Sequence, residues 1–191
     1  MRNSELNTKK FDELLRSDFQ QLSATFWSPE EVIKIAVEWM ELDASSKVLD
    51  IGSGVGKFCI EGARINEAQF TGVEIRPELV DEADRVVQEL GLKNVQFICS
   101  DIKDIDFSEF SSFFYYNSFC EHLSINEVID DSLDFSRENH REYEDLVFEQ
   151  MNKMPKTTKI VCYNSREFIL PNTYRLVRMN KEGDLALWIK N

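Results

Sequence analysis

The sequence has little cysteine and no long hydrophobic run. Its four cysteines among 191 residues, Cys59, Cys99, Cys120 and Cys162, lie far apart. This spacing fits neither a disulfide framework nor a Cys-x-x-Cys metal knuckle, so we expect reduced core thiols and no metal site. No segment approaches the roughly 18 apolar residues of a membrane span, and the polar segment 1–10 lacks a signal-peptide hydrophobic region. These absences predict a cytoplasmic protein without a membrane segment.

Positive charge is also scarce. The chain has 22 Lys and Arg against 35 Asp and Glu, which gives a formal net charge of −13. On average such a molecule repels anionic polymers and acidic membrane surfaces. We therefore do not expect a nucleic-acid partner, although the average charge does not exclude a local basic patch. The length suits one sizeable hydrophobic core.

Strand-like and helix-like segments alternate along most of the chain, which is typical of a parallel sheet with helices on both faces. Apolar segments predict strands at 47–51, 69–75, 94–100, 112–117 and 158–163. The strands at 94–100 and 112–117 are expected to be central and buried on both faces. The last two predicted strands, 173–179 and 184–190, flank a turn that contains Gly183, so the chain is expected to end in an antiparallel hairpin.

Two helices are predicted before the first strand. Segment 6–22 has the periodicity of an amphipathic helix, and we assign residues 1–27 to an N-terminal helical flap and 28–191 to the main domain. At the second helix Ser28 is expected to cap, Pro29 to occupy the first turn and Glu31 to complete a capping box. Phe26 and Trp27 either fold over a bound ligand as a lid or pack onto this helix as a hydrophobic staple.

Three of the seven glycines follow the first predicted strand directly, at Gly52, Gly54 and Gly56. A P-loop requires four residues between its first glycine and Gly-Lys, then Ser or Thr; here three residues intervene and Phe58 replaces the hydroxyl. A dinucleotide-binding G-x-G-x-x-G turn is one residue longer, so a nicotinamide-dependent oxidoreductase is a remote alternative. The G-x-G-x-G spacing suits a nucleoside cofactor without phosphate, such as S-adenosylmethionine.

Acidic side chains follow the next two predicted strands. Glu74 closes the second strand, where a carboxylate can accept hydrogen bonds from both ribose hydroxyls. Asp101 follows the third strand and is a candidate acceptor for the adenine amine, with Asp104 and Asp106 as alternatives. Because ligands of open α/β sheets bind at the carboxyl ends of strands, these positions predict a nucleoside site. Apolar contacts with the ring are assigned to Ile75 and Ile102.

Together these segments resemble the class I S-adenosylmethionine-dependent methyltransferases. The matching segments are 48–56, 71–75, 100–102 and 114–119, within a resemblance that covers about residues 28–190. It implies an α/β, Rossmann-like, seven-stranded, mostly parallel sheet with an antiparallel last strand, and S-adenosylmethionine as cofactor. The cofactor contacts that we assign are Asp50, Gly52, Ser53, Gly54, Gly56, Glu74, Ile75, Asp101, Ile102 and Asn117.

Within this class the core motifs are similar to the non-SET histone-lysine methyltransferase type. That type has Asn-Asn-Phe after its fourth strand, where this chain has Asn117-Ser118-Phe119, and this chain lacks the basic nucleosome-binding extension. The resemblance therefore implies a related core and not a chromatin substrate. Amino-methyltransferases acting on adenine or glutamine carry Asn/Asp-Pro-Pro-aromatic at this point. Residues 117–120 contain no proline, which argues against DNA as the acceptor.

Methyl transfer from a sulfonium depends mainly on aligning the acceptor with the methyl group, so no dedicated catalytic residue is strictly required. Asn117 and His122 are the assigned catalytic candidates, and Glu121 is also close to the fourth strand. The segment 120–123 resembles the Glu-His-Leu segment that borders the methyl site in small-molecule methyltransferases. A lone histidine after a strand is more often a polar residue at a helix start.

The acceptor itself is left open by the sequence. A protein amine or lysine is slightly preferred, a small molecule comes next, and a non-catalytic S-adenosylmethionine-binding or interaction module is the alternative from another class. An irregular acidic segment either forms a solvated face or attracts a cationic amine. Its acids are Glu127, Asp130, Asp131, Asp134 and Glu138. The oligomeric state is not predicted.

Overall fold

The computed structural model describes residues 10–123, 128–130, 132–133, 135–165 and 169–191. These residues form one seven-stranded sheet of order β3-β2-β1-β4-β5-β7-β6. Its first five strands pair in parallel, and β7 is antiparallel to both of its neighbours. The predicted sheet and its terminal hairpin are thereby confirmed. The strands are β1 (Lys47–Ile51), β2 (Gln69–Glu74), β3 (Val95–Cys99), β4 (Ser112–Tyr116), β5 (Lys159–Tyr163), β6 (Tyr174–Met179) and β7 (Leu185–Lys190).

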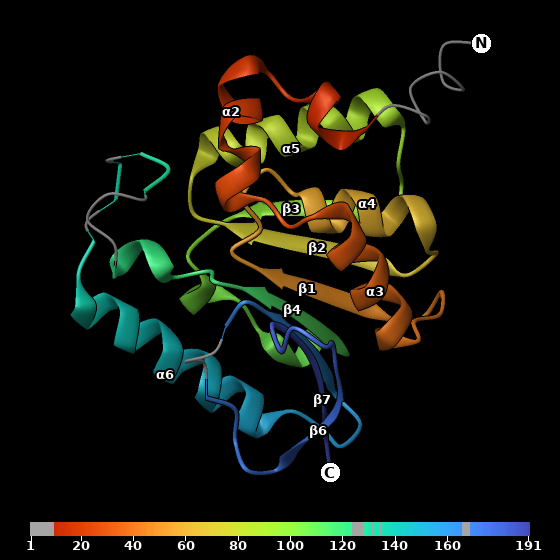
Figure 1. Ribbon diagram of the computed structural model, residues 1–191, viewed down its shortest axis with the longest axis vertical. Coiled ribbons are helices and arrows are strands. Elements are labelled where there is room, and N and C mark those ends of the chain that lie inside the picture. Colours follow the sequence, from red (N-terminus) through yellow and green to blue (C-terminus); the bar gives the residue numbers. More distant parts are fainter. Residues whose placement is uncertain (1–9, 124–127, 131, 134, 166–168) are drawn as a thin grey trace.

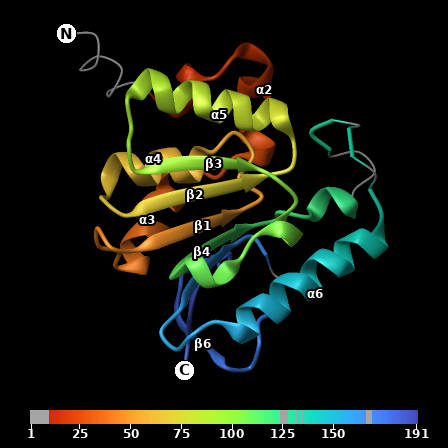
Figure 2. The ribbon, with the colours of Figure 1, turned by 180° about the vertical axis from the view of Figure 1, so that it is seen from behind.

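Helices cover both faces of the sheet (Figures 1 and 2). On one face lie α3 (Glu30–Met40), α4 (Lys57–Ile65) and α5 (Pro77–Leu90); on the other lie α6 (Arg137–Lys153) and two 3-10 turns, η2 (Ile102–Asp104) and η3 (Phe107–Glu109). Successive residues of β4 enter opposite cores: Phe114 packs with α3 and α4, and Phe113 with α6. No helix in the described part of the chain is long and apolar enough to cross a membrane.

The segment before α3 is broken into two short pieces, η1 (Phe11–Leu14) and α2 (Ser17–Phe26). A continuous helix through residue 22 is therefore wrong, and the part of that prediction before residue 10 lies outside the described residues. Between the two pieces Leu15 and Arg16 are extended. The backbone N–H and the Nε of Arg16 donate to Glu82 on α5, at 2.7 and 2.8 Å, and these bonds replace helical ones. Both pieces pack into a core shared with α4 and α5.

The start of α3 differs from the predicted capping box. The helix begins at Glu30, so Pro29 occupies the N-cap position, and no side chain caps the helix. Ser28, predicted as the cap, lies one residue too early because a residue before proline is held in extended conformation. Its side chain is buried at the wall of the cavity described below.

Strand β3 is at the edge of the sheet and is only half-buried, so the prediction of a central strand buried on both faces is wrong for 94–100. It holds for β4, which lies between β1 and β5. The edge position of β3 also changes the burial expected for one of the four cysteines. Cys59 and Cys162 are buried, Cys120 is half-buried, and Cys99 at the end of β3 is exposed rather than part of the core.

Candidate functional site

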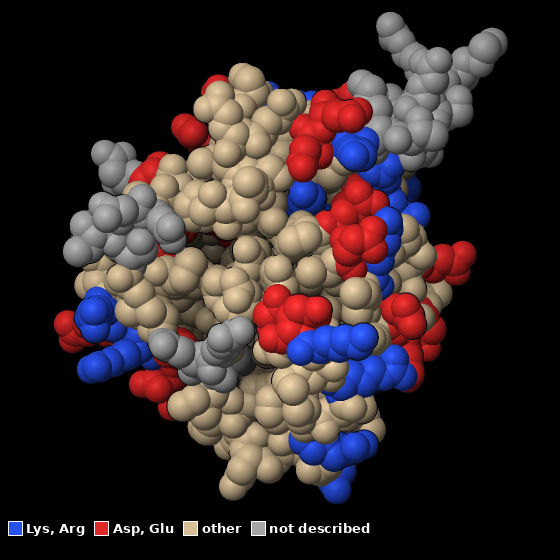
Figure 3. Space-filling view, viewed as in Figure 1, with Lys and Arg blue, Asp and Glu red and all other residues tan. Residues whose placement is uncertain are grey.

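A cavity of about 660 Å³ opens where β1, β2 and β4 end. It is visible as a hollow among mostly uncharged side chains in Figure 3, next to the ends of β1 and β2 in Figure 1. Small-molecule sites in proteins span roughly 300–1,000 Å³. The turn after β1, the end of β2, the segment after β4 and the end of α2 all contribute to its wall.

The glycine turn brings the backbone of β1 against this cavity. Gly54 has φ +55°, and a Cβ at this position would lie 2.6 Å from the Trp27 ring, so only glycine fits. Gly52, Ser53 and Gly54 line the cavity as predicted. Gly56 is not among the lining residues: it is the N-cap of α4, and a Cβ there would lie 2.2 Å from Phe97. Its role is to start the helix closely packed on β3.

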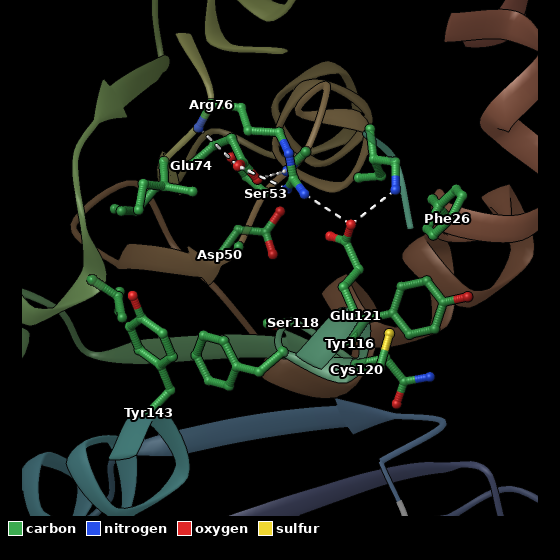
Figure 4. A pocket seen from close by; sticks show the side chains of 18 of the residues that line it. Phe26, Asp50, Ser53, Glu74, Arg76, Tyr116, Ser118, Cys120, Glu121 and Tyr143 are labelled. Carbon is green, nitrogen blue, oxygen red and sulfur yellow. Dashed lines mark hydrogen bonds and ion pairs between the residues drawn. The ribbon is translucent and has the colours of Figure 1, made fainter. Parts of the chain in front are cut away.

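Glu74 is buried at the end of β2 and lines the cavity. Its Oε2 accepts a hydrogen bond from the Gly54 N–H at 3.1 Å, and its Oε1 accepts one from the Arg76 N–H at 3.0 Å. Burial raises the pKa of Glu74, and the two backbone donors and the Arg76 charge oppose that rise. The carboxylate therefore faces the glycine turn and the cavity, where a ribose acceptor is needed (Figure 4).

Asp50 lies on β1 in the same space (Figure 4). The Cys59 thiol donates to its Oδ2 at 3.8 Å. Burial, with a contribution from the Glu74 charge, raises the pKa of Asp50 to about 8. A cationic group bound next to this carboxyl would compensate for its burial, so the residue fits the amino end of a ligand with an amino-acid tail.

Asp101 is held between η2 and α6. Its Oδ1 accepts from the Lys103 N–H, and its Oδ2 accepts from the Tyr143 hydroxyl, both at 2.9 Å. Burial, with the Asp101 hydrogen bond as the second cause, raises the pKa of Tyr143 to about 12. Asp101, Ile75 and Ile102 all line the cavity, which agrees with their assignment to the adenine end. The alternatives Asp104 and Asp106 line a different, shallower groove.

Asn117 and His122 also line the cavity. Asn117 has φ +45° directly after β4, and its N–H donates to the Ser165 hydroxyl at 3.4 Å. His122 ends the 3-10 turn η4 (Cys120–His122), and its Nδ1 accepts from the Ser136 N–H at 3.2 Å. Because Ser136 is the N-cap of α6, the histidine supports the start of that helix. The structure thus gives His122 a positional role beside the catalytic role predicted for it.

Several functional candidates were missed by sequence reasoning. Arg76 is buried in the cavity wall and pairs with Glu121 at 2.8 Å. Tyr143 comes from α6, far away in the sequence, and stacks on Phe119 with ring centres 4.9 Å apart. Arg76 follows β2 at the same sheet edge as Glu74, so the argument that selected Glu74 could have included it. No local sequence pattern identifies Tyr143 as a residue of the site.

The aromatic residues before α3 agree with the lid position predicted for them, and the staple onto α3 is not seen, because Trp27 packs with η1, α2, α4 and α5 instead. Phe26 and Trp27 line the cavity, as a lid would. The indole N–H of Trp27 donates to the Phe19 carbonyl at 3.0 Å, which fixes the ring against α2. Ser53 Oγ is a buried polar atom without a hydrogen-bond partner among the described residues, next to the nucleoside-binding turn. The donors, acceptors and apolar faces of this wall fit S-adenosylmethionine.

No group of three or more His, Cys, Asp or Glu side chains in the described segments is arranged to hold a metal ion. Several acidic residues were candidates for attracting a cationic amine. Of these, Glu127, Asp131 and Asp134 lie outside the described residues. Asp130 pairs with Arg76 at 3.2 Å; its side chain is 39% exposed, and it lies behind the cavity wall without lining the cavity.

The chain matches known methyltransferases in sequence. A family model described as a methyltransferase domain matches residues 42–184. Human EEF1A lysine methyltransferase 2 is 27% identical over 118 residues, covering 59% of this chain and 45% of that protein. The 23S rRNA (uracil(1939)-C(5))-methyltransferase RlmD of Shewanella sediminis is 37% identical over 73 residues, covering 38% of this chain and 16% of that protein. The chain spans less than half the length of these curated relatives.

Solved structures share the fold. An RNA methyltransferase from Salinibacter ruber in complex with S-adenosyl-L-homocysteine has a TM-score of 0.59 at 25% identity, covering 85% of this chain and 92% of that one. TrmN from Thermus thermophilus has a TM-score of 0.63 at 10% identity, covering 91% of this chain and 52% of that one, and it supports the fold alone.

These relatives include methyltransferases named for lysine and for RNA uracil, so the expectation that nucleic acid is not a partner gains no support. A non-catalytic binding module is not favoured either, because the named relatives are methyltransferases. The family model covers most of the chain, and the sheet order and glycine turn agree with it. The chain therefore belongs to the methyltransferase domain family and has the fold of the class I S-adenosylmethionine-dependent enzymes.

Proposed function

We propose that this chain transfers the methyl group of S-adenosylmethionine to an amine, with a protein lysine as the preferred acceptor and a small-molecule amine next. The observation that carries this proposal is the acidic lining of the cavity: Glu74, Asp101 and Glu121 lie against Lys57 and Arg76, and the protonated Asp50 can ionise next to a bound cation. Lys57 is already paired with Asp12 at 2.9 Å, and Arg76 with Glu121. The remaining negative potential favours cationic ligands. A lysine methyltransferase among the relatives supports the same class of acceptor.

The cofactor is assigned to the wall formed by β1, β2 and η2. In this proposal Glu74 accepts from the ribose hydroxyls, Asp101 accepts from the adenine amine, and Asp50 faces the amino-acid tail. Ile75 and Ile102 contact the faces of the adenine ring. When bound, the cofactor supplies a methyl group made electrophilic by the sulfonium. The protein contributes orientation, which is worth on the order of 7–11 kcal/mol for a well-aligned displacement.

The acceptor is assigned to the other side of the cavity. Figure 4 shows Phe26 and Tyr116 on the side opposite Tyr143. Aromatic faces attract a cationic amine and exclude water from the attacking nitrogen. Asn117, at the end of β4 between the two sides, is proposed to orient the acceptor by hydrogen bonding. His122 is proposed to border the methyl site; because its Nδ1 lone pair is taken by the Ser136 N–H, the acceptor amine loses its proton to water before it attacks.

Labelled-methyl transfer into cell extract tests this proposal. We expect radioactive methyl from S-adenosylmethionine to enter a protease-sensitive, ribonuclease-resistant fraction, and acid hydrolysis of that fraction to release methyl-lysine. Acetylation of the extract beforehand converts lysine amines into amides that cannot attack the methyl group and serves as the control, so it should abolish incorporation. Label that survives this blocking would contradict a protein lysine acceptor.

An RNA uracil is the second candidate acceptor. RlmD, one of the relatives, is named for that base, and the aromatic side chains of Phe26 and Tyr116 would also suit a planar ring. Incorporation that is lost on ribonuclease treatment and retained after amine blocking would support this candidate over lysine. The same experiment therefore separates the two.

A further inference from the structure

Arg76 is a fully engaged arginine in the wall of the cavity. Its side chain is 6% exposed, and it forms three ion pairs. Nη2 lies 2.8 Å from Glu121 Oε2, Nε lies 3.2 Å from Asp130 Oδ1, and Nη1 lies 3.6 Å from Glu74 Oε1. Neither the cofactor assignment nor the acceptor assignment uses this guanidinium.

These contacts join parts of the chain that are far apart in sequence. Glu74 ends β2, Glu121 lies in η4 after β4, and Asp130 lies in the segment before α6. Glu121 Oε2 also accepts from the Ile129 N–H at 2.8 Å, so the segment at 128–130 is tied to η4 through the same carboxylate. Figure 4 shows Arg76 between Glu74 and Glu121. The cofactor wall and the acceptor wall are thus connected through one cation.

We propose that Arg76 is a positioning residue for cofactor binding, which holds the Glu74 carboxylate in the cavity and connects it to the acidic side chains of η4 and residue 130. The proposal rests on the role assigned above to Glu74 as the ribose acceptor. Arginine suits this position because its planar fork offers five N–H donors to several carboxylates, whereas a lysine offers a single point charge.

The charges around Glu74 make the proposal measurable. The groups that act on Glu74 are Arg76 from the turn after β2, Glu121 from η4 and Asp50 from β1, while Asp130, from the segment before α6, pairs with the far side of Arg76. Burial is the main cause that raises the pKa of Glu74; Arg76 lowers it and Glu121 raises it. Loss of the Arg76 charge should therefore raise this pKa further. Loss of the Glu121 charge should lower it.

The experiment follows the Glu74 carboxyl carbon by NMR in protein labelled with 13C-glutamate, without ligand, and assigns the signal with Glu74→Gln. In Arg76→Gln we expect the titration midpoint to rise by about one pH unit or more, and in Glu121→Gln to fall. Arg76→Lys should bring the midpoint back toward the wild-type value. Arg85→Gln is the matched control, since Arg85 also pairs with two glutamates but does not line the cavity. It should leave the midpoint unchanged.

The dissociation constant of S-adenosylmethionine is measured on the same variants. At neutral pH we expect Arg76→Gln to weaken binding by about 10-fold or more, which a 1.4 kcal/mol loss would produce, and Arg85→Gln to bind as the wild type does. An unchanged Glu74 midpoint in Arg76→Gln would overturn the proposal. Failure of the wild type to bind the cofactor would instead refute the proposed function, because the NMR titration needs no ligand.

Discussion

At the scale of single residues, the assignment of a nucleoside site depends mainly on Glu74. It is buried, faces the glycine turn, and has acceptor capacity beyond its two backbone donors. Asp101 has a similar position but caps η2 and binds Tyr143 as well. The ribose end of the cofactor therefore depends on one carboxylate, and the adenine end on a carboxylate that is shared with the fold.

Glu74→Ala is expected to weaken S-adenosylmethionine binding by about 10-fold or more, because hydrogen bonds that a hydroxyl donates to a carboxylate are worth roughly 1.5–3 kcal/mol. Isothermal titration calorimetry measures the change. Glu78→Ala, at an exposed position in the first turn of α5, is the control. A folded Glu74→Ala protein with the wild-type dissociation constant would remove Glu74 from the ribose site.

Asp50 should make cofactor binding pH-dependent. Its pKa of about 8 means that the free protein carries a proton there at neutral pH. A cationic tail next to Asp50 favours the ionised form, so binding below pH 8 must also release that proton. We expect the affinity for S-adenosylmethionine to rise from pH 6 to pH 8 and then level off. Asp50→Asn should remove this rise in affinity between pH 6 and pH 8. Equilibrium binding measurements across the same pH range would show the change.

Residue-level prediction found residues that line the cavity where their positions follow from motif spacing. The glycine turn with Asp50, and Glu74 at the end of β2, could be found because strand ends in an open sheet share one edge. Arg76 was missed because its importance depends on Glu121 and Asp130, which only tertiary structure brings near. Gly56 was assigned to the cofactor from the motif, and the structure places it against Phe97 instead.

At the scale of elements, α5 organises the region before α3. Glu82 on α5 is 1% exposed, and its carboxylate accepts from the backbone and side chain of Arg16 and from Arg85. The contact with Arg16, which lies at the bend itself, fixes the bend between η1 and α2 and so sets the course of the chain toward Phe26 and Trp27. The wall of the cavity thus depends on an ion pair that lies outside it.

Glu82→Gln is expected to lower the free energy of unfolding by about 1–3 kcal/mol, because it removes the charge of a buried carboxylate that accepts hydrogen bonds from Arg16 and Arg85. Urea unfolding measures the loss, and Glu89→Gln on the exposed side of Arg85 is the control. Burial raises the pKa of Glu82, but Arg85 and Arg16 outweigh it and lower the pKa below its ordinary 4.5. The stabilisation is therefore present above pH 4.5 and is lost as the pH falls further. An equal difference at pH 7 and pH 3 would contradict this account.

Strands and most helices could be predicted because their periodicity is local. The position of β3 in the sheet could not be predicted, because its apolar residues would suit an edge strand as well as a central one. Only the order of the strands in the folded sheet shows that β3 lies at the edge. The break at Leu15 and Arg16 likewise depends on Glu82, more than sixty residues away. Local pattern predicts element type, and long-range polar contacts decide where elements bend.

Across the whole molecule the net charge of −13 acts on any charged acceptor. If the acceptor is a lysine-bearing protein, opposite charges accelerate encounter, and salt screens that attraction. We expect kcat/KM for a lysine acceptor to fall as the salt concentration rises from about 0.05 to 0.5 M, with Debye lengths shortening from above 10 Å to about 4 Å. A rate that rises with salt would point to an anionic acceptor such as RNA. The predicted cytoplasmic location stays a prediction.

Ser118 has a consequence for redesign of the acceptor preference. Its hydroxyl donates to the Ile51 carbonyl at the end of β1, and its Cβ faces Gly52, so the segment after β4 is fastened to the start of the glycine turn. Replacing residues 117–120 with a proline-rich loop would remove this hydrogen bond and disturb the neighbouring glycine turn. New chemistry in this scaffold should therefore be engineered from the α2 side, where Phe26 lines the cavity, and not at Tyr143, whose hydroxyl donates to the Asp101 carboxylate at the proposed adenine end.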